Sequence, residues 1–340
     1  MLSFRGAGAL VLTAAVGTGV LFAAPATASV TSATKVGAWS KSWTWFDKAV
    51  GPVDIYRGYD PGFAFATWQD TNSYKAHPLA PQNDYTFNLP PAEVASGAED
   101  AKLITFLKTT PWNIVLTNYH EPEQEIDAGL FSASAFRASE AHLAWLVHQQ
   151  NLADAGKRKV SLVLMISTFT HFKSRDPNTY WPTSADCPAL TVAAQCEPLD
   201  LVSVDAYAPP HATGTTVNGT VIPVGYTDGL KWPTAATLLA PAYNWSKTAR
   251  PWLSTGVAGT PWAISELGYL EDVNIAARKA DALTAAVTYA KQNNAQFIEY
   301  WDSKGGRADW ELHFTAPAST VSTSSTTASD AWKAAVDAAS

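Results

Sequence analysis

Short apolar runs alternate with longer segments of helical pattern along most of this chain, and this alternation limits its fold more than any other feature. It is typical of βα units, in which helices cover a parallel sheet. The eight runs predict strands at residues 35–39, 54–59, 85–88, 113–117, 160–167, 199–205, 262–265 and 296–301. Eight such units in a single domain predict an α/β fold, the (β/α)8 TIM barrel. An open doubly wound sheet is the alternative, but no G-x-G-x-x-G follows the first run.

The N-terminal end of the chain has the composition of an export signal. Arg5 precedes an almost uncharged apolar stretch at 7–24, and Ala26-Thr27-Ala28 supplies small residues for cleavage. This pattern predicts a signal peptide at 1–28 and a secreted protein. An uncleaved membrane anchor is the alternative.

The barrel is expected over residues 29–314, followed by a C-terminal region at 315–340. Within that region, 315–329 is rich in Ser, Thr and Ala and predicts a loop or linker. Residues 330–339 predict a short amphipathic helix, with Trp332 and Val336 spaced four apart. We expect this helix to close the barrel.

Charge and cysteine content exclude some classes of partner. The formal net charge is −7 at pH 7, and the chain lacks a Lys/Arg cluster, which argues against nucleic acid binding. The two cysteines, Cys187 and Cys196, lie in one segment, and in an exported protein they predict a disulfide bond. A metal-binding pair is the alternative, but no second Cys/His pair stands at zinc-site spacing.

Two of the apolar runs end in a glutamate. Glu121 follows the run at 113–117, and Glu266 follows the run at 262–265. A parallel barrel carries its chemistry at the C-terminal ends of its strands, so both carboxyl groups should meet on one face. Two carboxyl groups are what hydrolysis of a glycosidic bond requires, and with retention one acts as acid and the other as nucleophile. Glu123 and Glu125 compete with Glu121 for the acid role, but they follow Pro122 and should have left the strand.

Other polar and aromatic residues should reach the same face. Arg57 is expected either to form a structural ion pair or to keep the nucleophile ionised, and Tyr207 to donate a hydrogen bond to the same carboxylate. His120 is expected to bind a sugar hydroxyl or to orient a carboxylate. The predicted substrate-binding set is Arg57, Asn118, His120, Asp205, Tyr207, Tyr269 and Trp301.

The glutamate segments resemble those of a large clan of retaining (β/α)8 glycoside hydrolases, in which the acid/base ends strand four and the nucleophile ends strand seven. Tyr119-His120-Glu121-Pro122 is similar to family 26, which includes β-mannanases and related endo-β-glycanases, because His precedes the acid/base there. Ile264-Ser265-Glu266-Leu267-Gly268 is similar to the nucleophile strand. The run Pro-Glu-Gln-Glu after Glu121 departs from the Gly and aromatic residues usual in the mannanases, which leaves the sugar open.

The resemblance implies a secreted retaining hydrolase that cleaves β-glycosidic bonds of a polysaccharide or oligosaccharide by double displacement. Glu266 would attack, and Glu121 would serve as acid and then base. We expect a monomer with no cofactor, no metal, no nucleic acid partner and no membrane association after signal cleavage. A non-catalytic carbohydrate-binding barrel is the first alternative. A metal-dependent hydrolase using His120, Glu121, Asp205 and His171 is the second.

Overall fold

A computed structural model describes most of the barrel region. The described residues are 33–110, 113–154, 160–167, 175–186, 199–208, 216–217, 220–221, 226–227, 233–247, 260–269, 271–272, 278–305, 308–309, 312 and 325–339. All of them belong to the compact unit Thr31–Ser340. The predicted signal peptide, the cysteine pair Cys187 and Cys196, and His171 lie outside the described residues, so these expectations stay predictions.

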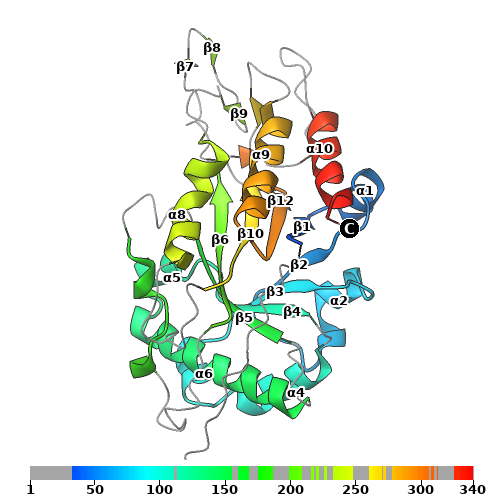
Figure 1. The fold of residues 1–340 in the computed structure, drawn as a ribbon. Coiled ribbons are helices and arrows are strands. Elements are labelled where there is room, and N and C mark those ends of the chain that lie inside the picture. Colours follow the sequence, from blue (N-terminus) through cyan, green and yellow to red (C-terminus); the bar gives the residue numbers. More distant parts are fainter. Residues whose placement is uncertain are drawn as a thin grey trace, which may run out of the picture. The chain divides into compact units, whose positions relative to one another are not determined.

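Eight parallel strands close into a barrel in the order β1-β12-β10-β6-β5-β4-β3-β2 (Figure 1). This architecture confirms the predicted (β/α)8 fold, and each strand overlaps its predicted run. The barrel strands are β1 (Lys35–Ser40), β2 (Ile55–Asp60), β3 (Asn83–Phe87), β4 (Ile114–Asn118), β5 (Val160–Ser167), β6 (Leu201–Tyr207), β10 (Trp262–Gly268) and β12 (Phe297–Asp302).

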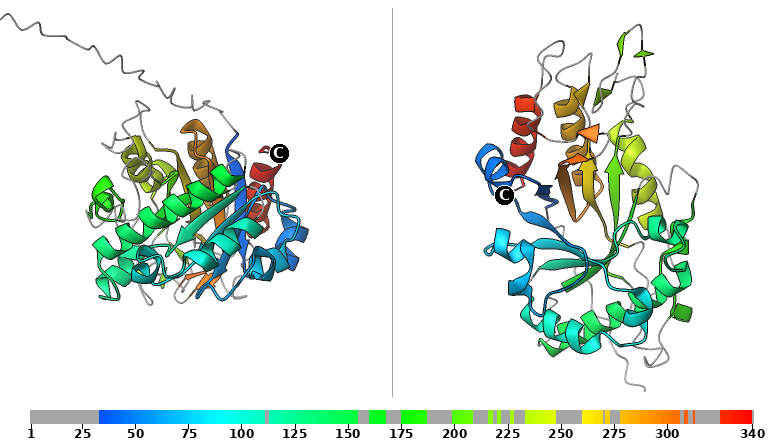
Figure 2. Two further views of the ribbon diagram at one scale, coloured as in Figure 1. Left: turned by 90° about the horizontal axis from the view of Figure 1, so that it is seen from below. Right: turned by 180° about the vertical axis from the view of Figure 1, so that it is seen from behind.

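Helices cover the outside of the barrel (Figures 1 and 2). The long helix α6 packs against β5, α8 against β6 and β10, and α9 against β12. The helices are α1 (Trp43–Ala49), α2 (Asn72–Ala76), α3 (Pro91–Ala95), α4 (Asp100–Thr109), α5 (Pro122–Asp127), α6 (Ala133–Ala153), α8 (Ala235–Lys247), α9 (Arg278–Gln292) and α10 (Ser325–Asp337). Among the described residues, no helix combines the length and the apolar character that crossing a membrane would need.

Short elements complete the described part of the chain. Single turns of 3-10 helix form η1 (Trp68–Asp70), η2 (Pro177–Thr179) and η3 (Ser184–Asp186). Two-residue strands form three small pairs outside the barrel: β7 (Thr216–Val217) with β8 (Thr220–Val221), β9 (Tyr226–Thr227) with β11 (Glu271–Asp272), and β13 (Lys304–Gly305) with β14 (Ala308–Asp309).

The C-terminal helix is longer than the sequence predicts. Helix α10 begins at Ser325, so the last five residues of the expected loop at 315–329 are helical. Ser and Thr have modest helix propensity, but tertiary burial of an apolar face stabilises a helix more than propensity does. Ala328 and Trp332 are both fully buried four residues apart, which extends that face toward the N-terminus of the helix. The helix packs against α9 and β1.

The barrel interior changes character along its axis. A cluster of six buried side chains fills one layer: Ile55, Val115, Val163, Leu201, Ala263 and Phe297. Because inward side chains recur every second residue along a strand, the next inward positions toward the C-terminal ends include Arg57, Ser203 and Glu299. The apolar layer therefore closes the N-terminal part of the barrel, and polar groups gather above it where the strands end.

Candidate active site

Glu121 stands in a turn whose backbone is strained. Strand β4 ends at Asn118, and both Tyr119 (φ 59°) and Glu121 (φ 50°) adopt the left-handed conformation, which is uncommon for residues with a side chain. The backbone N–H of Glu121 donates to the carbonyl oxygen of Met165 in β5 at 3.1 Å, which fixes the turn to the neighbouring strand. Strain of this kind persists where the surrounding structure imposes it, often at functional sites.

The surroundings of Glu121 favour its protonated form. Burial raises the pKa of this carboxyl group to about 8, and the carboxylates of Glu266, Glu123 and Glu125 add to the effect in that order. The side-chain amide of Gln124 donates a hydrogen bond to the Glu121 carboxylate and partly opposes the rise. Glu121 therefore holds a proton at neutral pH and can give it away.

A bulge in strand β10 brings Glu266 into the barrel. The register with β6 shifts between Ile264 and Glu266, so Ser265 is an extra residue in the strand. Ser265 forms a hydrogen bond with Ser203 of β6 at 2.5 Å, in the barrel interior. Glu266, the next residue after Ser265, also points into the interior, where it contacts Arg57. Two consecutive residues of a regular strand would face opposite sides, and the bulge removes that restriction.

Two donors hold the Glu266 carboxylate. Arg57 donates from Nη2 to Oε1 at 3.3 Å, and the hydroxyl group of Tyr207 donates to Oε2. Glu266 is only 4% exposed. A buried carboxylate with a guanidinium and a phenol as donors is held in one orientation and balanced in charge. Both oxygens of Glu266 are therefore held by donors within the barrel interior.

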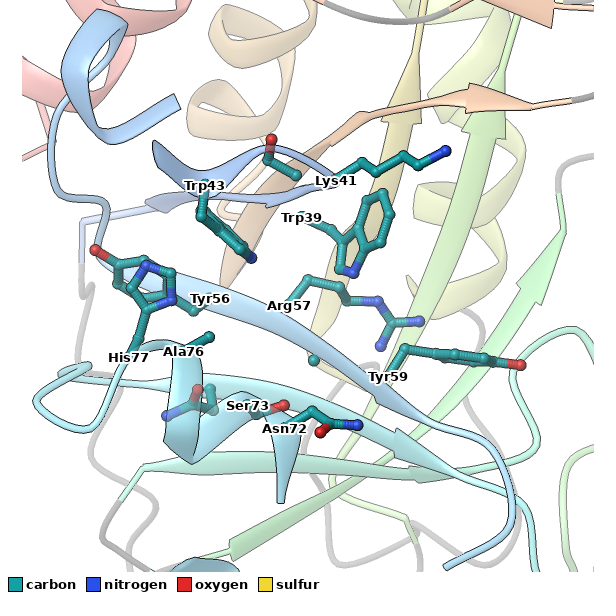
Figure 3. A pocket seen from close by; sticks show the side chains of 13 residues that line it. Trp39, Lys41, Trp43, Tyr56, Arg57, Tyr59, Asn72, Ser73, Ala76 and His77 are labelled. Atoms are coloured by element: carbon teal, nitrogen blue, oxygen red, sulfur yellow. The ribbon is translucent and has the colours of Figure 1, made fainter. Parts of the chain in front are cut away.

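Arg57 carries a positive charge in the middle of a group of buried acids. Burial alone would lower the pKa of the guanidinium, but the carboxylates of Asp84, Glu266, Asp205 and Glu299 raise it, so Arg57 stays charged. Its Nη1 donates to Asp84 at 3.2 Å and to Thr86 at 2.6 Å, and Figure 3 shows its side chain pointing inward from β2. Arg57 therefore forms the expected ion pairs, with Asp84 and with Glu266, while its action on a nucleophile stays a prediction.

Asp205 and Glu299 are two further buried acids of the site. Burial raises the pKa of Asp205 well above its ordinary value, and Glu266 and then Glu121 raise it further. Burial also raises the pKa of Glu299 well above its ordinary value, with Asp84 as the next cause. One guanidinium cannot balance every one of these carboxyl groups, so protonation of Asp205 and Glu299 keeps the interior close to neutral.

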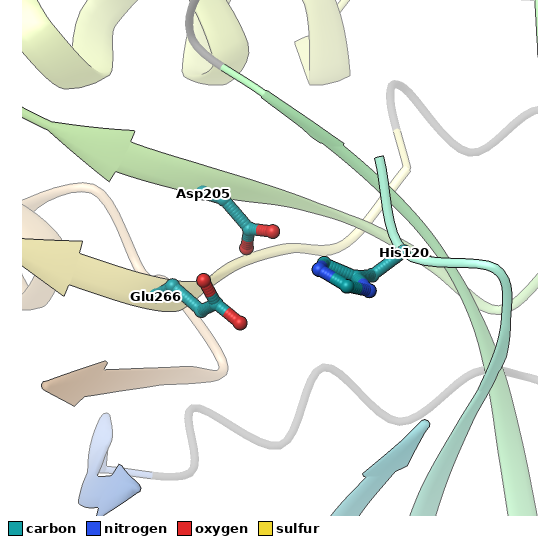
Figure 4. Close-up of side chains that lie close together, drawn as sticks. All are labelled: His120, Asp205 and Glu266. Carbon is teal, nitrogen blue, oxygen red and sulfur yellow. The ribbon is translucent and has the colours of Figure 1, made fainter. Parts of the chain in front are cut away.

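His120 faces Asp205 and Glu266 across the site (Figure 4). Ligand atoms from these three residues all lie within 4.8 Å of one another, which is a donor set that a metal ion could use. Arg57 opposes this use because its positive charge lies 3.3 Å from Glu266 and would repel a cation. Burial lowers the pKa of His120, and Tyr59 packs edge-on against its ring at 5.0 Å, so the imidazole is neutral and fixed in place.

The structure brings together most of the predicted site residues. Trp301 stacks on Trp39 at a centroid distance of 4.2 Å, and the two rings form an aromatic wall at the ends of β12 and β1.

Two predicted substrate-binding residues are placed differently. The Asn118 amide bonds to both backbone groups of Leu89, at 2.8 Å and 3.4 Å, and Tyr269 is fully buried. The two hydrogen bonds of Asn118 indicate a structural role instead of the predicted contact with substrate, whereas the predicted contact of Tyr269 stays a prediction.

Glu123, the main competitor for the acid role, uses its carboxylate in a structural hydrogen bond. Its Oε1 accepts a hydrogen bond from the backbone N–H of Ser167 at 2.7 Å, which links α5 to β5. Asp84 is not among the predicted site residues because Asn83 and Asp84 are poor strand formers, which places the predicted start of the third strand at Tyr85. Tyr59 is not among them either, although its two-residue spacing from Arg57 in the same strand indicates the same face.

No protein-family model and no curated protein sequence matches the chain. Among solved structures, the fold is similar to a glycoside hydrolase family 39 enzyme from Xanthomonas axonopodis pv. citri, with a TM-score of 0.50, 11% identity, and 89% of this chain and 65% of that chain covered. A family 26 β-mannanase from Bacteroides ovatus gives a TM-score of 0.49 at 10% identity, with 89% and 88% covered. A family 5 xyloglucanase from Paenibacillus pabuli gives 0.48 at 11% identity, with 90% and 99% covered. At these identities the likeness is one of fold alone.

Proposed function

We propose that this protein is a secreted retaining glycoside hydrolase that cleaves β-glycosidic bonds of a polysaccharide. The observation that carries the proposal is the contrast between two glutamates at the C-terminal ends of β4 and β10. Burial raises the pKa of Glu121 to about 8, so it is a proton donor, while Arg57 and Tyr207 hold Glu266 as a hydrogen-bond acceptor. The motif resemblance around these two residues, together with the barrel fold, supports the same assignment.

In the first step, a carboxylate oxygen of Glu266 forms a bond to the anomeric carbon of the sugar. The bond from that carbon to the glycosidic oxygen breaks, and Glu121 gives its proton to the departing oxygen. The product is a glycosyl ester on Glu266, and Glu121 is left as a carboxylate. Loss of the proton from Glu121 places a second negative charge near Glu266 only after the latter has become a neutral ester, so the two events support each other.

In the second step, the Glu121 carboxylate takes a proton from water, and the hydroxide oxygen attacks the anomeric carbon. The ester bond to Glu266 breaks and its carboxylate returns to Arg57 and Tyr207. His120 and Asp205 lie beside Glu266 and are placed to bind sugar hydroxyls, since neither oxygen of Asp205 has a hydrogen-bond partner among the described residues. The Trp39–Trp301 wall offers a flat apolar face for a sugar ring.

The test is an assay of new reducing ends on a panel of soluble β-linked polysaccharides. Wild-type protein should release reducing ends from at least one of them, and Glu121→Ala and Glu266→Ala should each lower the rate by three orders of magnitude or more, on the order of the loss expected for essential catalytic groups. Glu93→Ala changes an exposed glutamate in α3 and serves as the matched control. Full activity in either site variant would overturn the assignment.

Two further readouts separate the alternatives. Proton NMR of the first-formed product should show the β anomer if hydrolysis proceeds with retention. Glycan binding with no new reducing ends on any substrate would favour a carbohydrate-binding barrel. Export is tested by N-terminal sequencing of protein from the culture medium, where a mature chain starting at Ser29 is expected.

A further inference from the structure

The barrel wall is open between β1 and β2 at its C-terminal end. Strand β1 pairs with β12 over six positions, from Lys35 to Ser40, but with β2 only at Gly37 and Ala38. Beyond Ala38 the two strands part, so Trp39 and Ser40 have no register partner in β2. We call this opening the β1–β2 seam. Trp39 and Ser40 of β1 and Arg57, Gly58 and Tyr59 of β2 border this opening.

A cavity of about 260 Å³ fills the seam (Figure 3). Its inner part is lined by side chains that belong to the barrel interior, including Arg57 and Tyr59. Its outer part is lined by residues of α1 and α2, including Trp43 and Ser73. The cavity therefore extends from the active site sideways through the wall. Arg57 joins the two regions, because its Nη2 bonds to Glu266 while the same side chain lines the cavity.

Three buried polar atoms in the cavity lining have no hydrogen-bond partner among the described residues. They are Nε of Arg57, Oγ of Ser73 and Oδ1 of Asn83, in residues that are 2%, 9% and 3% exposed. Leaving a buried polar group unpaired costs free energy, so such groups are usually satisfied by a ligand or by water. Together they offer two donors and two acceptors to the hydroxyl groups of a ligand, since the Ser73 hydroxyl can act as either.

Aromatic rings line the outer part of the same cavity. The Trp43 ring lies 5.3 Å from Tyr56 and 4.4 Å from His77, and Tyr56 and His77 lie 4.0 Å apart. Aromatic faces combined with a few placed hydroxyl-binding groups suit a sugar, which has apolar C–H faces and a polar rim. The volume is below the range of about 300–1,000 Å³ usual for larger ligands, so it admits one sugar ring and not a chain.

We propose that the β1–β2 seam binds a single terminal sugar residue, either a side branch of the polysaccharide or its chain end. The proposal rests on the proposed glycoside hydrolase function and makes the seam a determinant of which substrates are accepted. The binding groups are the unpaired atoms of Arg57, Ser73 and Asn83 with the ring of Trp43. The protein then recognises its substrate both along the barrel face and sideways through the wall.

Binding is tested without hydrolysis, using a panel of methyl glycosides of neutral hexoses and pentoses and saturation-transfer NMR. At least one should bind to wild-type protein. Ala76→Phe places a ring at the cavity edge and should weaken that binding at least tenfold, whereas Ala101→Phe, an equal change at an exposed site in α4, should leave it unchanged. Ser73→Ala should weaken it on the order of threefold to tenfold, the value of one hydrogen bond.

The proposal is overturned if no methyl glycoside binds, which would leave the cavity to water, or if binding is the same in Ala76→Phe. Thermal unfolding of Ser73→Ala provides a check on folding, because removing an unpaired hydroxyl should not lower the melting temperature. Since these readouts need no catalysis, a failed hydrolysis assay and a failed seam proposal give different results.

The source of the sugar is identified with an active substrate. A branched polysaccharide, the same polymer after enzymatic removal of its side sugars, and a linear oligosaccharide are compared in Ala76→Phe and Ala101→Phe. A loss of kcat/KM confined to the branched polymer in Ala76→Phe identifies a side branch. A loss that includes the linear oligosaccharide identifies the chain end. Equal kcat/KM in both variants on all three substrates would contradict the proposal.

Discussion

At the scale of single residues, the site sets two chemically identical side chains to different tasks by their surroundings. Glu121 stands on a strained turn with carboxylates around it and one amide donor, Gln124. Glu266 stands on a bulged strand with a guanidinium and a phenol as donors. Burial and the neighbouring carboxylates raise the pKa of Glu121, whereas the Glu266 carboxylate accepts hydrogen bonds from two donors.

The pH dependence of kcat/KM should report the protonation of Glu121. Activity needs the protonated acid, so kcat/KM should fall as pH rises through about 8. Gln124→Leu removes the donor that stabilises the carboxylate, which raises the pKa of Glu121 and should move the alkaline limb to higher pH. Gln69→Leu, at an exposed glutamine of η1, is the matched control. An alkaline limb that stays in place or moves down in Gln124→Leu would show that another group controls it.

Removal of divalent metal should not change the rate. The positive charge of Arg57 beside Glu266 opposes a cation among His120, Asp205 and Glu266, and the proposed chemistry needs only two carboxyl groups. Activity after dialysis against EDTA should match that of untreated protein, and elemental analysis should find no stoichiometric zinc or manganese. Loss of activity with recovery on adding metal would support the metal-dependent alternative.

At the scale of elements, two backbone irregularities direct the side chains of Glu121 and Glu266. The left-handed turn after β4 presents Glu121, and the bulge in β10 turns Glu266 inward beside Ser265. Helix α10 acts at longer range. Its Trp332 is fully buried and lies 5.4 Å from Tyr300, whose neighbours in β12 are Glu299 and Trp301. The helix therefore supports the strand that carries one wall of the site.

Removing the buried indole ring of Trp332 in α10 should destabilise the whole barrel. Trp332→Ala leaves a cavity against β12, and loss of a buried aromatic side chain costs about 3–5 kcal/mol. Urea unfolding should report this as a lower midpoint. In the same helix, Lys333→Ala removes an exposed pair with Asp337 and a 3.4 Å hydrogen bond to the carbonyl oxygen of Val50, and should cost no more than about 1–2 kcal/mol. Equal midpoints for Trp332→Ala and wild type would mean that α10 is not part of the cooperative core.

At the scale of the whole barrel unit, stability and function compete for the same interior. The apolar layer at the N-terminal end contributes burial, while the layer above it holds Arg57 and four acids. Burying acids costs free energy, and the cost depends on pH because their pKa values differ from those of the unfolded chain. The buried acids of the site therefore lower the free energy of unfolding of the protein.

Replacing Glu299 should reveal this cost. Burial raises its pKa in the folded state, so the folded protein binds more protons than the unfolded chain above about pH 4.5, and stability falls as pH rises from there. The glutamine in Glu299→Gln cannot ionise, so this variant does not lose that stability. The difference in free energy of unfolding between Glu299→Gln and wild type should therefore grow in favour of the variant, by up to about 2 kcal/mol from pH 5 to pH 7. Urea titrations of both proteins at the two pH values measure the difference. A difference that does not change with pH would show that Glu299 is ionised in the fold.

The strand count, the barrel fold and the positions of Glu121 and Glu266 could be predicted from the chain because strand periodicity is a local property. The starts of β3 and α10 could not, since Asn83 and Ser325 have weak propensities that tertiary packing overrides. The same limit applies to Asn118 and Tyr269. Their positions at strand ends predicted substrate contact. Local sequence does not show that the Asn118 amide forms hydrogen bonds with the backbone of Leu89, or that Tyr269 is fully buried.

By itself the sequence determined which residues stand at the ends of the strands, because alternating apolar runs fix where each strand lies along the chain. Only the tertiary structure decided which of them meet. Arg57, Tyr207 and Glu266 come from three strands far apart in the chain, and the β10 bulge and the β1–β2 seam exist only through pairing between strands. Protonation depends on burial and on charges from many elements at once, so the roles of the two glutamates follow from the closed barrel.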